Sequence, residues 1–269
     1  PVSHQIVLKV IRSHKIKSCS LDPLPASVFS RCIDCLLPAV TDIINDSLKA
    51  GVCPEPLKTA LIVPTLKKSS LDPENLKNYR PISNLSFISK VIERVICTQL
   101  MTYLASNSLL ASRQSAYREN HSVETVLLRV QNDLLLSLDS GNEALLVLLD
   151  LTSAFDTVDH QLLSRLEKCY GISGTAAKWF ESYLSGRKQQ VIIDGITSDP
   201  ALLRWGVPQG SVIGPLLFIC FTTLIQDIIH SHGFTSMMYA DDKQLYITVK
   251  PSVINHITQK LDICLQEIR

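Results

Sequence analysis

The sequence lacks a long uninterrupted apolar segment. Its longest apolar runs, Leu145–Leu149 and Leu216–Phe221, are far shorter than the roughly 18 residues that a membrane-spanning helix needs. No charged-then-apolar leader follows Pro1, so no signal peptide is visible. We therefore expect no membrane partner, and we interpret the two runs as a buried strand and a buried helix.

Paired cysteines at metal-binding spacing are also missing. Eight cysteines are scattered along the chain, and only Cys32 and Cys35 form a C-x-x-C motif. A zinc site needs four ligands, and no second pair stands at a suitable distance. Reduced thiols are the default without a secretion signal. We interpret Cys32 and Cys35 as part of a buried helix face, with a metal or redox role as the alternative.

The chain has little net charge, only +1, but its charges are unevenly distributed. Residues 1–118 carry 15 Lys and Arg against 8 Asp and Glu, whereas residues 119–269 carry 11 against 17. A basic half beside an acidic half fits a protein that binds phosphates with one part and metal ions with the other. Chance clustering of solvated charges is an equal alternative on this observation alone.

Apolar periodicity predicts a mixed fold without internal repeats. Helices are expected over residues 27–37, 38–50, 89–104, 123–138, 159–168, 173–184, 211–232 and 253–268. Strands are expected over residues 60–63, 144–149, 189–193, 235–239 and 244–249, with a hairpin at Asp194-Gly195. The run 144–149 has the pattern of a fully buried central strand. The sequence thus predicts an α+β sheet covered by helices on one side.

Three aspartates stand where they are costly. Asp241 and Asp242 are adjacent at a predicted hairpin turn, where like charges repel, and Asp150 ends the run predicted to be buried. An ordinary Asp-containing turn is the simpler interpretation of the pair alone. If the two strands are neighbours, the carboxylates converge into an oxygen-only site suited to Mg²⁺ or Mn²⁺. Two such ions can hold the attacking and leaving oxygens of an in-line displacement.

Five motifs, and their order along the chain, resemble those of reverse transcriptases. Their sequences are most similar to those of the LINE-type, non-LTR retrotransposons of animals. They are Asn78-Tyr79-Arg80-Pro81-Ile82-Ser83, Gln114-Ser115-Ala116-Tyr117-Arg118, Leu149-Asp150-Leu151-Thr152-Ser153-Ala154-Phe155-Asp156, Gly206-Val207-Pro208-Gln209-Gly210-Ser211 and Tyr239-Ala240-Asp241-Asp242. Each is weak or moderate alone, and together in register they are specific. Lys243 departs from the pattern, since Thr usually follows the paired aspartates, and it would compete with a metal or pair with Asp242.

The resemblance implies a right-hand polymerase palm, an antiparallel sheet packed on helices, with fingers. It implies an N-terminal helical extension over residues 1–47 and a reverse transcriptase domain over 48–269. Within that domain, the fingers would span about 48–142 and the palm about 143–269, with a hairpin insert near 187–205. In the family a thumb follows, and the chain ends before it.

The resemblance also assigns roles to single residues. Asp150, Asp241 and Asp242 would be the catalytic acids and the ligands of two Mg²⁺ ions, or Mn²⁺, assisted by the Leu151 carbonyl. Four residues would contact the incoming nucleotide. They are Arg80 at the triphosphate, Phe155 as the gate against a ribose 2′-hydroxyl, Gln209, which would help place the nucleotide and the template base, and Gly210. Arg118 and Tyr239 would contact template or primer.

The function implied is RNA-directed DNA synthesis from an RNA template, a DNA primer and dNTPs, by two-metal nucleotidyl transfer. The family implies residence in the nucleus, the cytoplasm or both. The alternative is a catalytically inactive retrotransposon remnant that acts at most as a nucleic-acid-binding module. Another two-metal palm enzyme, such as a nucleotide cyclase, fits the acids but not the motifs around Arg80 and Gln209.

Overall fold

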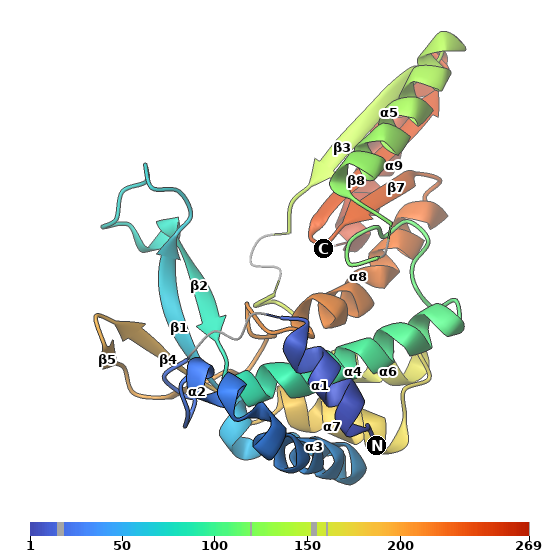
Figure 1. Ribbon diagram of the computed structural model, residues 1–269. Coiled ribbons are helices and arrows are strands. Elements are labelled where there is room, and N and C mark those ends of the chain that lie inside the picture. Colours follow the sequence, from blue (N-terminus) through green and yellow to red (C-terminus); the bar gives the residue numbers. More distant parts are fainter. Residues whose placement is uncertain (15–18, 119, 152–154, 160, 269) are drawn as a thin grey trace. The chain divides into compact units, whose positions relative to one another are not determined.

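The computed structural model describes residues 1–14, 19–118, 120–151, 155–159 and 161–268, and the chain divides into two compact units (Figure 1). Unit 1 comprises Pro1–Asn107 and Phe155–Gly214, and unit 2 comprises Ser108–Ala154 and Pro215–Arg269. Both combine helices with sheet, which confirms the predicted α+β class. The boundaries of fingers and palm stay a prediction.

The helices of unit 1 form its core together with one sheet. They are α1 (His4–Arg12), α2 (Ala26–Arg31), α3 (Ile33–Ala50), α4 (Phe87–Ser106), α6 (Gln161–Lys168) and α7 (Gly174–Leu184). α4 buries Val91, Val95 and Leu104 at helical spacing, which explains why the periodicity predicted it well. The predicted break at Pro38 was wrong. α3 includes Pro38, and the two helices are separated at Cys32 instead.

The sheet of unit 1 has five strands. They are β1 (Thr59–Leu66), β2 (Tyr79–Asn84), β4 (Lys188–Ile193), β5 (Ile196–Thr197) and β6 (Ala201–Leu202). β1 lies between antiparallel β2 and parallel β4, and the hairpin predicted at Asp194-Gly195 is present as β4–β5. β1 continues past Pro64, where it pairs only with β2, so the missing N–H of the proline breaks no ladder on the β4 side.

Unit 2 is built on a three-stranded antiparallel sheet in the order β3-β8-β7. Its elements are α5 (Val123–Asp139), β3 (Glu143–Leu149), α8 (Gly214–Ser231), β7 (Thr235–Tyr239), β8 (Asp242–Val249) and α9 (Ile254–Ile268). Leu245 packs with Ile229 of α8 and Leu261 of α9, whereas Tyr246 packs with Val126 of α5. Helices therefore cover both faces, and the prediction of one covered face was wrong.

The run 144–149 is not the buried central strand that its composition predicted. β3 lies at the edge of the sheet, and Leu146 and Leu148 are exposed on one face while Leu145 and Val147 pack against the core on the other. A continuous apolar run hides this alternation, because periodicity is invisible when both faces carry leucine.

Two further expectations were wrong. Cys32 and Cys35 are exposed, so they are not part of a buried helix face. The expectation of reduced thiols is confirmed, since all eight cysteines are free. α8 is long and apolar enough to cross a membrane by length and composition, contrary to our estimate from uninterrupted runs. Leu216–Cys220 of α8 are buried inside the protein, which is the usual position of a core helix with this composition.

Candidate active site

The predicted acids of unit 2 meet at one end of its sheet. β3 and β8 pair antiparallel up to Leu149 opposite Lys243, so Asp150 follows directly at the level of Asp242. β7 and β8 end in the pair Tyr239 and Asp242, with Ala240 and Asp241 in the turn between them. The adjacency of the two strands, which the prediction required, is therefore present.

Strand alternation determines the face on which these side chains lie. Directly opposed residues of antiparallel strands point to the same face, and neighbours along a strand alternate. Leu149 and Lys243 point toward α8 and α9, so Asp150 and Asp242 are placed on the opposite face, as is Tyr239. Asp150 and Asp242 are exposed to solvent, where ionised carboxylates are inexpensive.

The donor chemistry of this sheet end fits a hard divalent cation, because three carboxylates and main-chain carbonyls are all oxygen ligands. Within the described ranges, however, no three Asp, Glu, His or Cys side chains come together as a group that could hold a metal ion. The backbone thus gathers Asp150, Asp241 and Asp242, but their side chains do not converge into one metal cage.

Lys243 lies beneath the acids rather than among them. It is 1% exposed, and its Nζ lies 5.5 Å from the ring centre of Phe218 on α8. Its ammonium has no hydrogen-bond partner among the described residues. Burial lowers its pKa to about 8, against the opposing influence of Asp241 and Asp242. The expected pairing with Asp242 is not formed, and strand alternation turns Lys243 to the other face.

The predicted nucleotide-binding residues belong to unit 1, where main-chain hydrogen bonds join three separate segments. Ser83 N, on the strand that carries Arg80, donates to Gln209 O at 2.7 Å. Val207 N donates to Phe155 O at 2.9 Å. The strand that carries Arg80, the segment at Phe155 and the glycine-rich loop 206–210 are thereby joined by main-chain hydrogen bonds. The preceding residues 152–154 lie outside the described ranges.

Two glycines of this loop allow the close approach. A Cβ on Gly206 would lie 2.7 Å from Phe155 O, and one on Gly210 would lie 2.6 Å from Ser83 O. Both residues also have positive φ, +81° and +120°, which L side chains rarely adopt. Turn geometry and close backbone contact therefore explain why glycine stands at these positions.

A buried carboxylate supports the same loop from α4. Glu93 is 1% exposed, and its Oε2 accepts from Val212 N at 2.6 Å and Ile213 N at 3.4 Å, directly after the loop. Its Oε1 accepts from Ser89 Oγ at 3.3 Å. Burial raises the pKa of Glu93, while Arg187 and the two N–H donors oppose the rise. The sequence analysis did not identify Glu93. Its position among the apolar residues of a predicted helix was the feature that could have indicated a buried acid.

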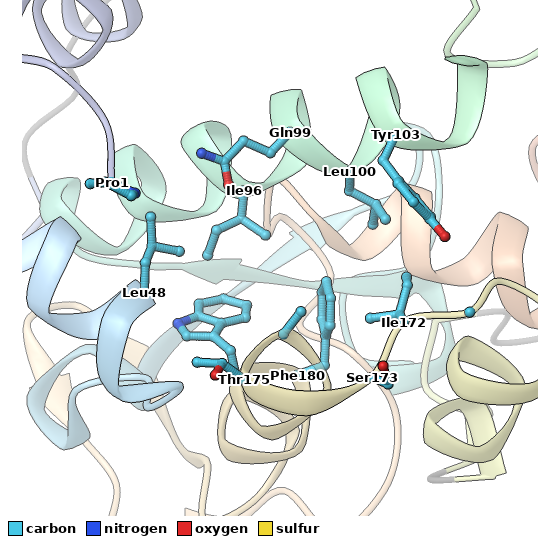
Figure 2. A pocket seen from close by; sticks show the side chains of 13 residues that line it. Pro1, Leu48, Ile96, Gln99, Leu100, Tyr103, Ile172, Ser173, Thr175 and Phe180 are labelled. Carbon is cyan, nitrogen blue, oxygen red and sulfur yellow. The ribbon is translucent and has the colours of Figure 1, made fainter. Parts of the chain in front are cut away.

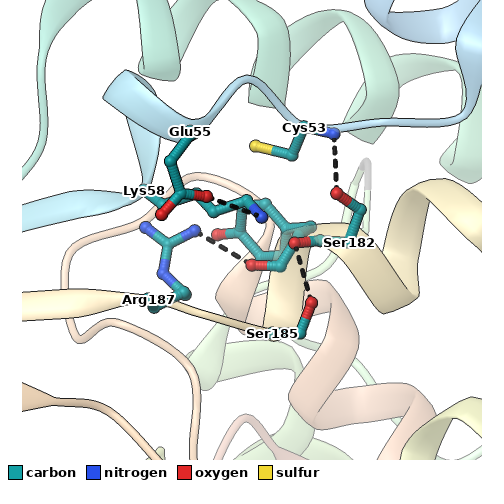
Figure 3. Close-up of polar contacts among 7 residues, drawn as sticks. Cys53, Glu55, Lys58, Ser182, Ser185 and Arg187 are labelled. Atoms are coloured by element: carbon teal, nitrogen blue, oxygen red, sulfur yellow. Dashed lines mark hydrogen bonds and ion pairs between the residues drawn. The ribbon is translucent and has the colours of Figure 1, made fainter.

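Arg187 is the buried cation that faces Glu93, and Figure 3 shows its surroundings. It is 1% exposed, donates from Nη1 to Tyr183 O at 3.1 Å and lies 4.6 Å from the centre of the Tyr183 ring. Nearby, Lys58 pairs with Glu55 at 3.2 Å, and Cys53 N donates to Ser182 Oγ at 3.0 Å. Nε and Nη2 of Arg187 have no hydrogen-bond partner among the described residues.

The other predicted residues show mixed surroundings. Arg80 is exposed on β2, as a phosphate contact requires. Arg118 instead donates Nη1 to Ala111 O and Gln114 O, which ties its guanidinium to its own loop. Tyr239 packs against the cluster that Val126 and Val130 of α5 form with the sheet, and Leu151 follows β3 outside any helix or strand. Their roles toward nucleic acid and metal stay predictions.

A cavity of about 400 Å³ in unit 1 is separate from these residues (Figure 2). Leu48 of α3, Ile96 of α4 and Trp179 of α7 are among its apolar lining residues. None of the predicted site residues lines it. The cavity therefore adds nothing to the candidate active site.

Comparisons with known proteins agree with the motifs. The family model described as reverse transcriptase (RNA-dependent DNA polymerase) matches residues 66–269. The probable RNA-directed DNA polymerase from transposon BS of Drosophila melanogaster is 34% identical over 67% of this chain and 20% of that protein. The RNA-directed DNA polymerase from mobile element jockey of Drosophila funebris is 31% identical over 81% of this chain and 24% of that protein.

The fold has a counterpart among solved structures. The apo telomerase of Candida tropicalis, truncated from its C-terminal domain, matches with a TM-score of 0.55 and 12% identity over 78% of this chain and 47% of that chain. The chain spans only about a fifth to a quarter of the two Drosophila relatives. Because the family model covers most of the chain and the relatives are polymerases of mobile elements, the chain belongs to the reverse transcriptase family, in its LINE-type, non-LTR branch.

Proposed function

We propose that the chain performs RNA-directed DNA synthesis, adding dNTPs to the 3′ end of a primer on an RNA template. The observation that carries the proposal is the β3–β8–β7 register, which gathers Asp150, Asp241 and Asp242 at one sheet end. In this reaction the primer 3′-oxygen bonds to the α-phosphorus of the dNTP, and the α–β bridging bond breaks. Pyrophosphate leaves, and the proton of the hydroxyl passes to solvent.

The acids act as ligands. Asp150 and Asp241 would be the principal ligands of two Mg²⁺ or Mn²⁺ ions, with Asp242 and the Leu151 carbonyl assisting. When bound, two such ions supply charge neutralisation and align the attacking and leaving oxygens. Asp150 and Asp242 are exposed, so neither carboxylate needs a buried partner and both are accessible to a cation.

Unit 1 supplies the contacts with the nucleotide. Exposed Arg80 suits triphosphate oxygens, since a guanidinium fork binds them in pairs. Gln209 has a buried Oε1 without a partner among the described residues, an acceptor that a bound ligand can satisfy. Phe155, tied to the loop through its carbonyl, would exclude a 2′-hydroxyl by steric clash. Arg118 and Tyr239 would contact the template and primer.

The test is incorporation of dNTPs on a primed RNA template with Mg²⁺ or Mn²⁺. We compare the chain with its Asp241→Asn variant and with Asp227→Asn, which changes an exposed aspartate of α8 in the same unit. Removing a metal-ligating charge is expected to lower the rate at least about a hundredfold, by analogy with other lost electrostatic contacts. Asp227→Asn should retain the rate.

A longer version of the chain separates two kinds of failure. Since the relatives are several times longer, the assay is repeated with the segment that follows the matched region in a relative appended to this chain. Activity only in the longer version would assign the acids as competent and the duplex contacts as insufficient. Equal, metal-independent rates in all variants, or no activity in either version, would overturn the proposal.

One observation favours the alternative, an inactive module that binds nucleic acid. The three carboxylates do not form a metal-binding group within the described ranges. A remnant of this kind would bind primed RNA without incorporating dNTPs, and its binding would not change in Asp241→Asn. The incorporation assay above therefore distinguishes the two functions directly.

A further inference from the structure

One buried amide side chain contacts the turn that carries Asp241. Gln114 is 4% exposed, and its Oε1 accepts from Ala240 N at 3.2 Å and from Ala116 N at 3.0 Å. Its Nε2 lies 3.5 Å from Ala240 O, at the limit of a hydrogen bond. One side chain thus meets both polar main-chain atoms of the residue that precedes Asp241.

Ala240 needs such support because its conformation is unfavourable. Its φ is +55°, in the left-handed region that non-glycine residues rarely adopt. A conformation of this kind is unfavourable for an L residue and persists only where the surroundings enforce it. Because Asp241 follows Ala240 directly in the turn, a change of φ at Ala240 would alter the direction of Asp241.

Gln114 is itself fixed against β7 by its neighbours. Met238 N donates to Arg113 O at 2.9 Å, and Ser115 N donates to Met238 O at 2.9 Å. These two bonds place Gln114 in a parallel bridge beside Met238, two residues before Ala240. Arg118 adds a bond from Nη1 to Gln114 O at 3.2 Å. The backbone of Gln114 is therefore fixed by bonds that do not depend on the contact between its side chain and the turn.

We propose that Gln114 is a positioning residue for nucleotidyl transfer, which holds Ala240 in its left-handed conformation and so directs the Asp241 carboxylate toward the cation. The inference rests on the proposed function, and it gives the segment Gln114–Arg118 a structural task at the acid turn. The main support is the pair of hydrogen bonds that Oε1 accepts, since a buried N–H that loses its acceptor is costly.

The test compares variants that keep or remove the acceptor. Gln114→Glu keeps Oε1, whereas Gln114→Met keeps the length of the side chain and removes both polar atoms. Binding of Mn²⁺ is followed by the electron paramagnetic resonance signal of the free ion, and hydrogen exchange is followed at the Ala240 amide. Gln114→Met should weaken Mn²⁺ binding and speed Ala240 exchange, each about tenfold, while Gln114→Glu should stay within about threefold.

Two further variants separate positioning from packing. In an Ala240→Gly background positive φ carries no penalty, so the effect of Gln114→Met on Mn²⁺ binding should shrink to about threefold or less. The matched control is Gln226→Met in the same unit, because Gln226 has a buried Oε1 without a partner among the described residues. It should bind Mn²⁺ like the unaltered chain. If Gln114→Met does not fold, Gln114→Asn, whose shorter amide cannot reach Ala240, replaces it with the same expectation.

The outcomes are distinct. If Asp241→Asn lowers Mn²⁺ binding but Gln114→Met does not, or if Gln114→Met and Gln114→Glu are equally impaired, the role of Gln114 is overturned and the proposed function stands. If Gln114→Met has the same effect in the Ala240→Gly background as in the otherwise unaltered chain, the left-handed turn is not what Gln114 controls. If Asp241→Asn binds Mn²⁺ normally, the metal role proposed for Asp241 fails, and this inference fails with it.

Discussion

Units 1 and 2 each fix a loop that carries predicted site residues, but they use different chemistry. In unit 1 the ionisable carboxyl of Glu93 accepts from the backbone after the Gly-rich loop, with the buried cation Arg187 facing it. In unit 2 the neutral amide of Gln114 does the corresponding work at the acid turn. Both side chains are buried acceptors of main-chain N–H groups, one ionisable and one neutral.

The difference has a thermodynamic consequence. A buried carboxyl and a buried guanidinium stabilise each other against a desolvation cost, so removing either partner leaves an uncompensated charge. Removing a neutral amide leaves only its former N–H donors unsatisfied, which costs less free energy than a buried unpaired charge. The loop of unit 1 should therefore be more sensitive to mutation and to pH than the turn of unit 2.

The largest expected effect follows from removing Glu93. Glu93→Ala should lower the free energy of unfolding of unit 1 by about 3–5 kcal/mol, because Val212 N and Ile213 N lose their buried acceptor and a cavity is left beside α4. Denaturant unfolding followed by tryptophan fluorescence measures this, since Trp179 and Trp205 both lie in unit 1. Glu181→Ala, at an exposed acid of α7, is the control. A loss below about 1 kcal/mol would remove the basis of the comparison.

The close approach of the loop to Phe155 should give the next largest effect. Gly206→Ala adds a Cβ 2.7 Å from Phe155 O, whereas Gly186→Ala adds one with nothing within 4 Å at a similar positive φ. We expect a loss of about 2–4 kcal/mol for the first and about 1 kcal/mol for the second. The same fluorescence measurement applies, and equal losses would show that φ alone, not contact, requires glycine.

A smaller effect of opposite sign is expected in unit 2. Lys243→Met replaces a buried ammonium without a partner among the described residues by an apolar side chain of similar length. The substitution should raise the stability of unit 2 by about 1–2 kcal/mol, measured by hydrogen exchange of the β8 amides. Lys250→Met, at an exposed site, should leave exchange unchanged. Faster exchange in Lys243→Met would contradict the destabilising role assigned to the buried ammonium.

The smallest expected effect is a pH dependence of unit 1 that arises from Glu93. Because burial raises the folded-state pKa of Glu93, its contribution is fully present below its ordinary pKa of 4.5 and is lost as pH rises through the folded-state value. The groups facing it are Arg187 and Tyr183. As pH rises, the Tm of Glu93→Gln should therefore increase relative to that of the unaltered chain, by about 2–4 °C in the transition followed by tryptophan fluorescence. Parallel profiles would contradict the assigned shift.

Parts of the fold could be predicted because local signals and packing agree. α4 and the hairpin of β7 and β8 have periodicity that matches their burial, and polar residues mark the cap of α4 and the turn of the hairpin. β3 could not be placed correctly, because leucines on both of its faces conceal an edge strand with one exposed face. Whether a strand lies at the edge or in the centre of a sheet depends on which strands pair with it, and that pairing is a long-range property.

The candidate site shows the same limit. Asp150, Asp241 and Asp242 were identifiable because they stand at the ends of predicted strands within recognisable motifs, and the register then placed them together. Gln114 and Glu93 were not, because their importance lies in backbone groups more than 100 residues away in sequence. A buried polar residue has no sequence pattern of its own unless its partner is known.

The most direct test of the central claim addresses the sheet end through Asp150. We would measure single-turnover incorporation of dTTP on oligo(dT)-primed poly(A) by the longer version of the chain, comparing Asp150→Asn with Asp139→Asn, an exposed aspartate that ends α5 in the same unit. The register predicts that Asp150→Asn loses at least about a hundredfold in rate while Asp139→Asn stays within about twofold. A normal rate in Asp150→Asn would contradict the claim that the β3–β8–β7 end carries the chemistry.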